Sequence, residues 1–389
     1  MTEPNAAPHS ERDPAATTDA NETETETRDQ EKEDHKPRDS HGWDGKLRID
    51  KMTLADEPRD PHAEVVSDAE LSDDEGPPPE QLAADEDLLD DMPEDEDDIE
   101  LVHCKISDMT SLRLERFKQI KRLCLRQNRI ESISIPSDAA STLTEIDLYD
   151  NLIAHTKGLD AFTELTSLDL SFNKIKHIKR LNHLTKLQDL YFVQNKISTI
   201  ENLEGLSNLR QIELGANRVR DIAGLETLTG LEELWLGKNK ITEIKGLDTL
   251  ANLKILSIQS NRLRAITGLE KLVNLEELHI SHNLLTDLSG LENNVNLEVI
   301  DISANPIEHL TGLKTLSHLK EFWASNCKFS NFDEIKEQLG DKEKLETVYF
   351  EGNPLQRSSP VLYRNKLLFS LPKTIKQIDA TYVQPVKTV

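Results

Sequence analysis

The sequence predicts an α/β solenoid, a curved superhelix of about twelve repeats with a parallel sheet on its concave side and a cap at its C-terminal end. Three observations support this prediction. An asparagine recurs every 22 or 23 residues, apolar residues recur at fixed offsets around it, and the last 35 residues depart from the repeat. Such a period is typical of short units that stack, because no single unit can bury its own apolar side chains.

The repeats follow the pattern LxxLxLxxN, as in LTSLDLSFNKI and LEELWLGKNKI, which is the signature of leucine-rich repeats. The last residue of this pattern, here called the ladder residue, lies where the chain leaves a predicted strand, and its amide can bond to backbone groups of the loop. A longer step of 26 residues precedes the last repeat and predicts a longer helix over SNFDEIKEQLGDKEKLE. The twelve ladder residues are Cys104, Asn128, Asn151, Asn173, Asn195, Asn217, Asn239, Asn261, Asn283, Asn305, Cys327 and Asn353.

Apolar side chains surround each ladder residue at constant offsets. Those at −5 and −3 are predicted to point inward from a short strand, and those at +2, +5, +8 and +11 fill the same core from the returning half of the repeat. One position departs from this rule, because Asn294 stands where a core leucine is expected.

Charge divides the chain into two parts. Residues 1–100 hold 35 of the 72 acids and only 9 of the 46 bases, so the whole net charge of −26 lies there. Few core-forming residues accompany these charges, and such a segment is expected to stay disordered. We therefore predict a disordered acidic tail over 1–94, a leucine-rich-repeat solenoid over 95–354 and a C-terminal cap over 355–389.

Several classes of protein are disfavoured. The sequence contains no glycine-rich phosphate loop, no GxSxG and no HExxH, which predicts that the chain is not an enzyme and needs no cofactor. It has no secretory signal and no apolar run of about 18 residues, so no membrane association is expected. The three cysteines form no CxxC pair, which indicates a reducing compartment. No basic patch accompanied by aromatic residues was found, so we expect no nucleic-acid partner.

The residues at −6, −4 and −2 alternate with the core positions and are predicted to face outward on the concave side. The −4 position collects acids and large aromatics, the −6 position adds acids, and the −2 position is mostly small. Exposed Trp and Tyr are typical binding anchors, and the acids favour a partner with basic groups. The pattern predicts a protein-binding cradle, with contact candidates that include Asp147, Asp169, Glu233, Glu277 and His279.

Longer runs of sequence are more specific than the generic repeat. The segments LGKNKITEI, GLENNVNLEVIDISANPI, LKEFWASN and LETVYFEGNPLQ, with the ending IKQIDATYV, resemble the regulatory subunit 7 family of type 1 protein phosphatase. The resemblance covers about residues 95–385 and includes a C-terminal cap marked by Tyr363-Arg364, Leu371-Pro372 and Ile378-Asp379.

This resemblance implies a regulator that holds the phosphatase catalytic subunit on its concave face and controls its maturation, targeting or activity. It also implies a third component, an inhibitor subunit, and roles in mitosis in the nucleus and cytoplasm; we expect the chain to be monomeric on its own. The positions that match the contact positions of the family are Tyr191, Glu213, Trp235, Asp301, Glu321, Trp323 and Tyr349. Two alternatives stay open, a spliceosomal leucine-rich-repeat protein and a cytoskeletal or ciliary assembly scaffold.

Overall fold

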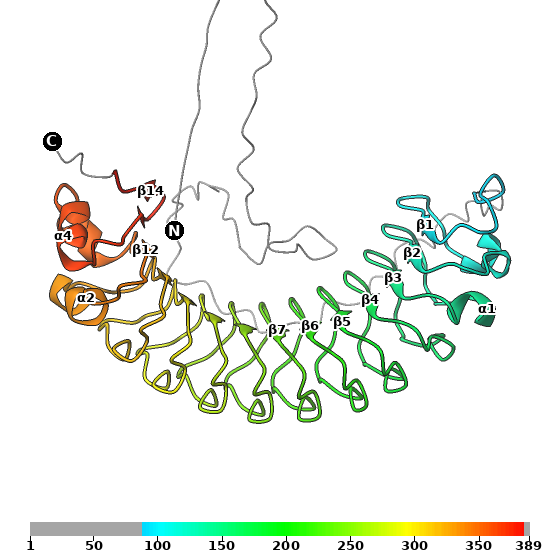
Figure 1. Cartoon of the computed structure of the whole chain (residues 1–389), viewed down its shortest axis with the longest axis horizontal. Helices are drawn as coiled ribbons and strands as arrows, with labels where there is room; N and C mark the ends of the chain where they lie inside the picture. Colours follow the sequence, from blue (N-terminus) through cyan, green and yellow to red (C-terminus); the bar gives the residue numbers. More distant parts are fainter. Residues whose placement is uncertain (1–87, 385–389) are drawn as a thin grey trace, which may run out of the picture. The chain divides into compact units, whose positions relative to one another are not determined.

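The computed structural model describes residues 88–384, and these form one arc with the strands along its inner side (Figure 1). Their fourteen strands make a single sheet in which the order in space is the order in sequence. Strands β1 to β13 pair in parallel, and only the last pair, β13 with β14, is antiparallel. This is the parallel concave sheet that the repeat period predicts.

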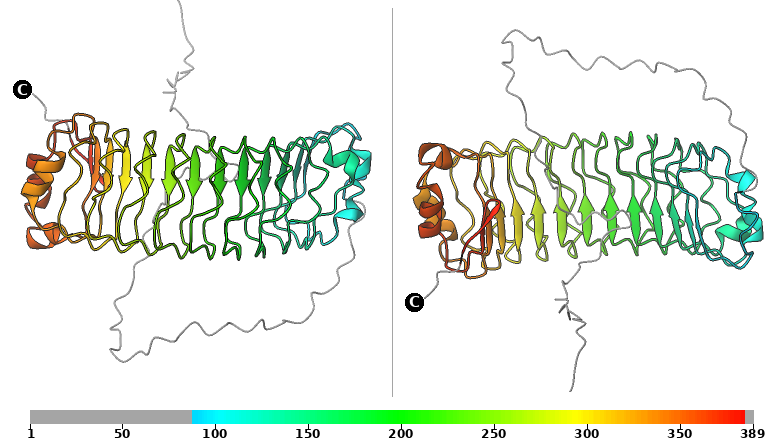
Figure 2. Two further views of the ribbon diagram at one scale, coloured as in Figure 1. Left: turned by 90° about the horizontal axis from the view of Figure 1, so that it is seen from below. Right: turned by 90° about the horizontal axis from the view of Figure 1, so that it is seen from above.

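Every ladder residue follows a strand at the same distance. The three residues at −6 to −4 form the strand in all twelve repeats, and successive strands pair without any register shift. In the views from below and from above, the strands lie side by side as a row of arrows (Figure 2). The twelve strands are β1 Asp98–Glu100, β2 Arg122–Cys124, β3 Glu145–Asp147, β4 Ser167–Asp169, β5 Asp189–Tyr191, β6 Gln211–Glu213, β7 Glu233–Trp235, β8 Ile255–Ser257, β9 Glu277–His279, β10 Val299–Asp301, β11 Glu321–Trp323 and β12 Thr347–Tyr349.

The ladder asparagines bind backbone groups of two adjacent repeats. Asn239 donates from Nδ2 to the carbonyl oxygens of Leu214 (2.9 Å), Leu236 (3.0 Å) and Gly237 (3.3 Å), and its Oδ1 accepts from the backbone N–H of Val219 at 2.9 Å. Cys327 takes the same slot with its Sγ 3.4 Å from the carbonyl oxygen of Ile302. The predicted role of the ladder, to satisfy buried loop groups, is confirmed.

The apolar offsets form one continuous core. In the repeat of Asn239, the side chains of Ile241, Ile244, Leu247 and Leu250 are all buried, as are their counterparts along the arc. Asn294 takes a leucine position because its Nδ2 donates to two carbonyl oxygens of the preceding repeat, at 3.0 and 2.9 Å.

Helices are confined to the two ends of the arc. The convex side between β3 and β11 is made of turns rather than of the helices that an α/β class implies. The predicted longer helix is present as α2, and Ile335 and Leu339 are its buried apolar residues. None of the helices in residues 88–384 is long and apolar enough to cross a bilayer. The helices are η1 Met109–Leu112, η2 Leu114–Arg116, α1 Ser137–Ala140, α2 Phe332–Leu339, α3 Pro354–Ser358 and α4 Tyr363–Ser370.

The N-terminal end of the solenoid begins earlier than the sequence predicts. Residues 88–94 were assigned to the acidic tail, but Leu89 is buried in the core and its carbonyl accepts a hydrogen bond from Arg116. The Asp90 carboxylate pairs with Arg113 and Arg116. Leu89 and the ion pairs of Asp90 attach this segment to the first repeat, although the predicted boundary at 94 places it in the tail. The rest of the predicted tail, 1–87, lies outside the described residues.

The C-terminal cap closes the other end. Strands β13 Gln377–Ile378 and β14 Thr381–Tyr382 extend the sheet beyond β12. Asp379 Oδ1 accepts from the backbone N–H groups of Phe350 (2.8 Å) and Glu351 (3.0 Å), and Tyr363 Oη donates to Asp379 Oδ2 at 3.0 Å. Arg364 donates to the carbonyl oxygens of residues in β13 and β14. These contacts involve the Tyr-Arg and Ile-Asp pairs that the sequence marks as a cap.

Candidate protein-binding face

The −4 residues of strands β5 to β12 form one row across the concave sheet. Each pairs in register with the −4 residue of the next strand, as Trp235 does with Ser257 and Trp323 with Tyr349. The row, here called the concave row, consists of Tyr191, Glu213, Trp235, Ser257, His279, Asp301, Trp323 and Tyr349. It contains six of the seven residues at family contact positions; Glu321 lies at −6 of β11, beside Trp323.

The concave row is much less exposed than the sequence predicts. Its side chains point away from the core, as the alternation requires, yet Tyr191, Trp235 and His279 are only 5, 7 and 7% exposed. These three side chains are therefore not the freely exposed anchors that alternation predicts. For Trp235 and His279, the rings of neighbouring strands cover one another. Only Asp301, Trp323 and Tyr349, at the C-terminal end of the row, are half-buried.

Aromatic rings connect the row from β7 to β12. Small Ser257 separates Trp235 from His279, and their rings stack across it with centroids 6.4 Å apart and planes 17° apart. Trp323 then meets His279 edge-on at 6.2 Å and Tyr349 edge-on at 5.8 Å. Pairs of this geometry stabilise one another by about 0.5–1.5 kcal/mol beyond burial. The result is a preformed aromatic strip rather than a set of separate side chains.

Glutamates at −6 are held by the aromatic residues two positions later. Trp235 Nε1 donates to Glu233 Oε2 at 3.2 Å, and Trp323 Nε1 donates to Glu321 Oε2 at 3.1 Å. A ring nitrogen of His279 lies 3.3 Å from Glu277 Oε2. Burial raises the pKa of the Glu233 carboxyl, and the bond from the indole opposes that rise. The aromatic strip therefore carries a parallel line of oriented carboxylates.

The concave surface from β5 to β12 contains seven acids and no Lys or Arg at its −6, −4 and −2 positions. These acids are Asp189, Glu213, Glu233, Glu277, Asp301, Glu321 and Glu351. A surface with one sign of charge and a preformed aromatic strip is complementary to a partner with basic and apolar groups. The cap joins this surface, since Gln377 donates to Tyr349 Oη at 2.6 Å.

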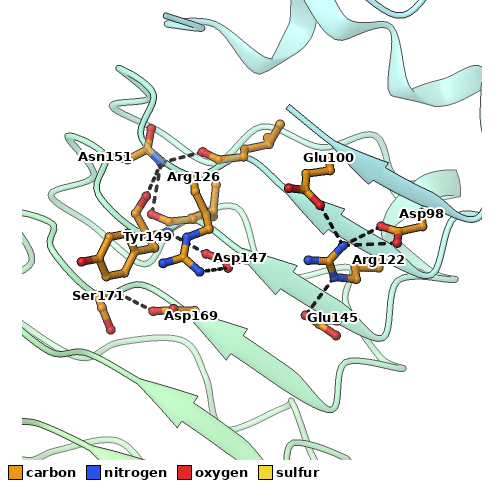
Figure 3. Close-up of polar contacts among 12 residues, drawn as sticks. Asp98, Glu100, Arg122, Arg126, Glu145, Asp147, Tyr149, Asn151, Asp169 and Ser171 are labelled. Carbon is orange, nitrogen blue, oxygen red and sulfur yellow. Dashed lines mark hydrogen bonds and ion pairs between the residues drawn. The ribbon is translucent and has the colours of Figure 1, made fainter. Parts of the chain in front are cut away.

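The N-terminal third of the concave side is different, because its acids are paired within the chain (Figure 3). Arg122 lies among Asp98 (2.9 Å) and Glu145 (3.2 Å), and Arg126 lies 3.4 Å from Asp147. The Arg126 guanidinium also stacks on Tyr149, 4.3 Å from the ring centre. Sequence reading missed both arginines as concave residues, although their −6 and −2 offsets place them there.

Asp147 and Asp169, two of the second-tier candidates, are both buried. Burial and the neighbouring Asp147 raise the pKa of Asp169 to about 7, although its Oδ1 accepts from the backbone N–H of Ser171 at 2.7 Å. The Asp147 carboxylate forms an ion pair with Arg126 (Figure 3). The structure thus brings Trp235, His279 and their glutamates into one surface with the matched residues, and leaves these two aspartates outside it.

The arrangement has the features of a binding surface rather than of a reaction centre. Among residues 88–384, no three His, Cys, Asp or Glu side chains are grouped so that they could hold a metal ion. Burial raises the pKa of the Cys124 thiol to about 11 and that of Cys327 to about 12. Both thiols are therefore poor nucleophiles at neutral pH.

Residues 229–271 and 273–315 match the family described as "Leucine Rich repeats (2 copies)", and residues 163–219 match "Leucine rich repeat". The structure of an internalin from Listeria monocytogenes aligns with a TM-score of 0.59 at 20% identity, over 74% of this chain and 87% of the internalin. That likeness concerns the fold alone. The fold and these matches define a leucine-rich-repeat protein.

A more specific relationship comes from two proteins of known name. The chain is 70% identical to Protein phosphatase 1 regulatory subunit SDS22 of Schizosaccharomyces pombe over 309 residues, which is 79% of this chain and 92% of the relative. A shorter match, 45% over 56 residues and 14% of each chain, is to human Protein phosphatase 1 regulatory subunit 7. The chain belongs to the family of protein phosphatase 1 regulatory subunit SDS22. This membership agrees with the predicted absence of enzymatic activity and disfavours the spliceosomal and ciliary alternatives.

Proposed function

We propose that the chain binds the catalytic subunit of type 1 protein phosphatase through the concave row and the glutamates beside it. The names of the relatives supply the class of partner. The observation that carries the proposal is the contiguous strip of Trp235, His279, Trp323 and Tyr349, with no cation on the concave positions from β5 to β12.

Preorganisation favours this use of the strip. The indoles of Trp235 and Trp323 are fixed by stacking and by bonds to carboxylates, so little side-chain freedom is lost when a partner binds. Asp301, Trp323 and Tyr349 are half-buried and offer the largest accessible part of the strip. We therefore assign the strongest contacts to strands β10 to β12, and a supporting role to the more enclosed Tyr191, Glu213 and Trp235.

Electrostatics favours a basic area on the phosphatase. The seven acids at the concave positions of these eight strands attract cationic groups over about one Debye length, about 8 Å at physiological ionic strength. The association rate is then expected to fall as salt is added, with a smaller effect on dissociation.

Three finer parts of the proposal depend on the family resemblance. An inhibitor subunit joins the pair in a ternary complex, the chain is a monomer before it binds, and the complex acts in the nucleus and cytoplasm. Size-exclusion chromatography with light scattering measures the first two directly. Imaging of a fluorescent fusion tests the third.

The experiment for the partner is a calorimetric titration of the full chain with the type 1 catalytic subunit, and in parallel with the type 2A catalytic subunit. Saturable binding to the type 1 enzyme, with a dissociation constant at or below about 1 μM, is the expected result. Absence of binding to the type 1 enzyme, or equal binding to both enzymes, would contradict the proposed function.

A further inference from the structure

A row of cations follows the edge of the solenoid at which the strands end. The residue directly after the ladder asparagine is basic in five consecutive turns: Lys174, Lys196, Arg218, Lys240 and Arg262. In each of these residues the backbone N–H donates to a carbonyl oxygen of the preceding turn, at 2.8 or 2.9 Å. The five residues are therefore stacked in line, one for each strand spacing of about 4.8 Å.

Further cations widen this row. Lys176, Arg220 and Arg264 lie two residues later in alternate turns, and Lys238 lies directly before its ladder asparagine. Together the nine residues are called the basic edge. From −1 to +3 of the ladder, these five turns contain no Asp or Glu. Seven of the nine side chains are exposed, and Lys196 and Lys240 are half-buried.

None of the nine cations forms an ion pair with another residue in the part of the chain that the structure describes. Two nearby acids, Asp221 and Glu243, form ion pairs with Lys245 instead, with N–O distances of 3.0 and 3.6 Å. Like charges stacked at strand spacing repel one another, so a counter-charge supplied from outside would relieve that repulsion.

At the opposite edge of the solenoid, where the strands begin, charged residues are paired within the chain. There, basic and acidic residues before the strands form ion pairs between neighbouring turns. The N–O distances are 2.5 Å for Lys186 with Glu164, 3.2 and 2.7 Å for Glu232 with Arg210 and Lys254, and 2.7 Å for Glu298 with Lys320. The two edges have the same repeat geometry. Within residues 88–384, four cations of the opposite edge pair with acids of neighbouring turns, whereas the nine cations of the basic edge do not.

We propose that the basic edge binds an acidic peptide segment of a partner protein, at a surface separate from the concave row. The basic edge is narrow, because acids of the concave side lie on the same turns as its cations. A single extended chain can contact the cations without covering these acids. A duplex nucleic acid or an anionic membrane is broader and would also cover those acids, which repel it. Five turns span about 19 Å, which an extended peptide covers with about six residues.

The test is a fluorescence-anisotropy titration of the full chain with a labelled octapeptide of alternating glutamate and aspartate, at an ionic strength of about 0.05 M and again at about 0.15 M. One variant carries R218Q, R220Q, R262Q and R264Q. The matched control carries K186Q, R210Q, K254Q and K320Q, which changes the net charge equally on the opposite edge. Surface ion pairs contribute little to folding, so both variants are expected to keep the wild-type melting curve.

We expect the peptide to bind the wild-type chain, and the affinity to fall at least about tenfold in the basic-edge variant but less than about twofold in the control. An equal loss in both variants would reduce the effect to net charge and overturn the assignment. So would the absence of peptide binding by the wild-type chain. Tighter binding of a single-stranded oligonucleotide of the same charge, lost in the same variant, would show instead that the edge recognises nucleic acid.

Discussion

Removal of one ladder amide, in Asn239→Ala, tests the physical basis of the solenoid. Asn239 makes four hydrogen bonds, and its Oδ1 is the acceptor for the backbone N–H of Val219, a fully buried residue. A buried donor left without a partner costs about 1–3 kcal/mol. The three carbonyls each keep a second donor: the Ala216 N–H for Gly237, Asn217 Nδ2 for Leu214 and Asn261 Nδ2 for Leu236. We expect a loss of about 1–3 kcal/mol in the free energy of unfolding, which comes chiefly from the Val219 N–H.

The assay is equilibrium urea unfolding followed by far-UV circular dichroism. The matched control is Asn252→Ala in the same turn, because Asn252 makes one exposed bond to the Thr229 carbonyl at 2.9 Å. That variant is expected to lose less than about 1 kcal/mol. Equal unfolding midpoints for the two variants, with equal slopes, would refute the idea that the buried ladder contributes more than any surface amide.

Three further predictions concern the backbone, a buried acid and the thiols. Gly158→Ala should destabilise the fold by at least about 1 kcal/mol more than Gly230→Ala, because Gly158 has φ +97° and an added methyl would lie 2.1 Å from a carbonyl oxygen, against 3.4 Å at Gly230; equal melting temperatures would contradict this. The raised pKa of Asp169, about 7, means that its stabilising contribution is complete below about pH 4 and is lost as the pH rises through 7. Asp169→Asn should therefore gain stability relative to wild type between about pH 5 and pH 8, and a pH-independent difference in thermal melts would exclude this linkage. Burial raises the pKa of the Cys327 thiol to about 12, so iodoacetamide should modify half-buried Cys104 well before Cys327, as mapped by mass spectrometry; equal rates would argue against the buried position.

The ladder and core positions could be predicted because one 22-residue period fixes both. Even the irregular ladder residue Cys327 followed from the offsets of its neighbours, and the structure places a strand before it as before every asparagine. The cap at Tyr363 and Asp379 followed from resemblance and is confirmed by their bond. The repeat period alone determines the ladder and core positions, so both can be predicted from the sequence.

The exposure of the concave row could not be predicted from alternation alone. Alternation gives the direction of a side chain, whereas the 7% exposure of Trp235 depends on how closely the neighbouring strands pack and on the small Ser257 beside it. The attachment of Leu89 was missed for a similar reason, since one leucine in an acidic segment gives no periodic signal. The basic edge, in contrast, has a signal at ladder +1 that a search based on net charge and aromatic residues does not reveal.

The central claim is that the concave row binds the phosphatase catalytic subunit. The most direct measurement is its dissociation constant for the double variant Trp235→Ala, Trp323→Ala beside the control Phe172→Ala, Phe369→Ala, which removes two exposed aromatics outside the row. An anchor such as Trp323 typically costs at least about 2 kcal/mol, and the supporting contact of Trp235 adds to that loss, so we predict at least about a hundredfold weaker binding for the double variant and less than about a twofold change for the control. Because the stacked rings also stabilise the fold, the double variant is expected to melt at a lower temperature, and binding is measured where its circular dichroism shows that it is folded. Wild-type affinity in a folded Trp235/Trp323 variant would contradict the account.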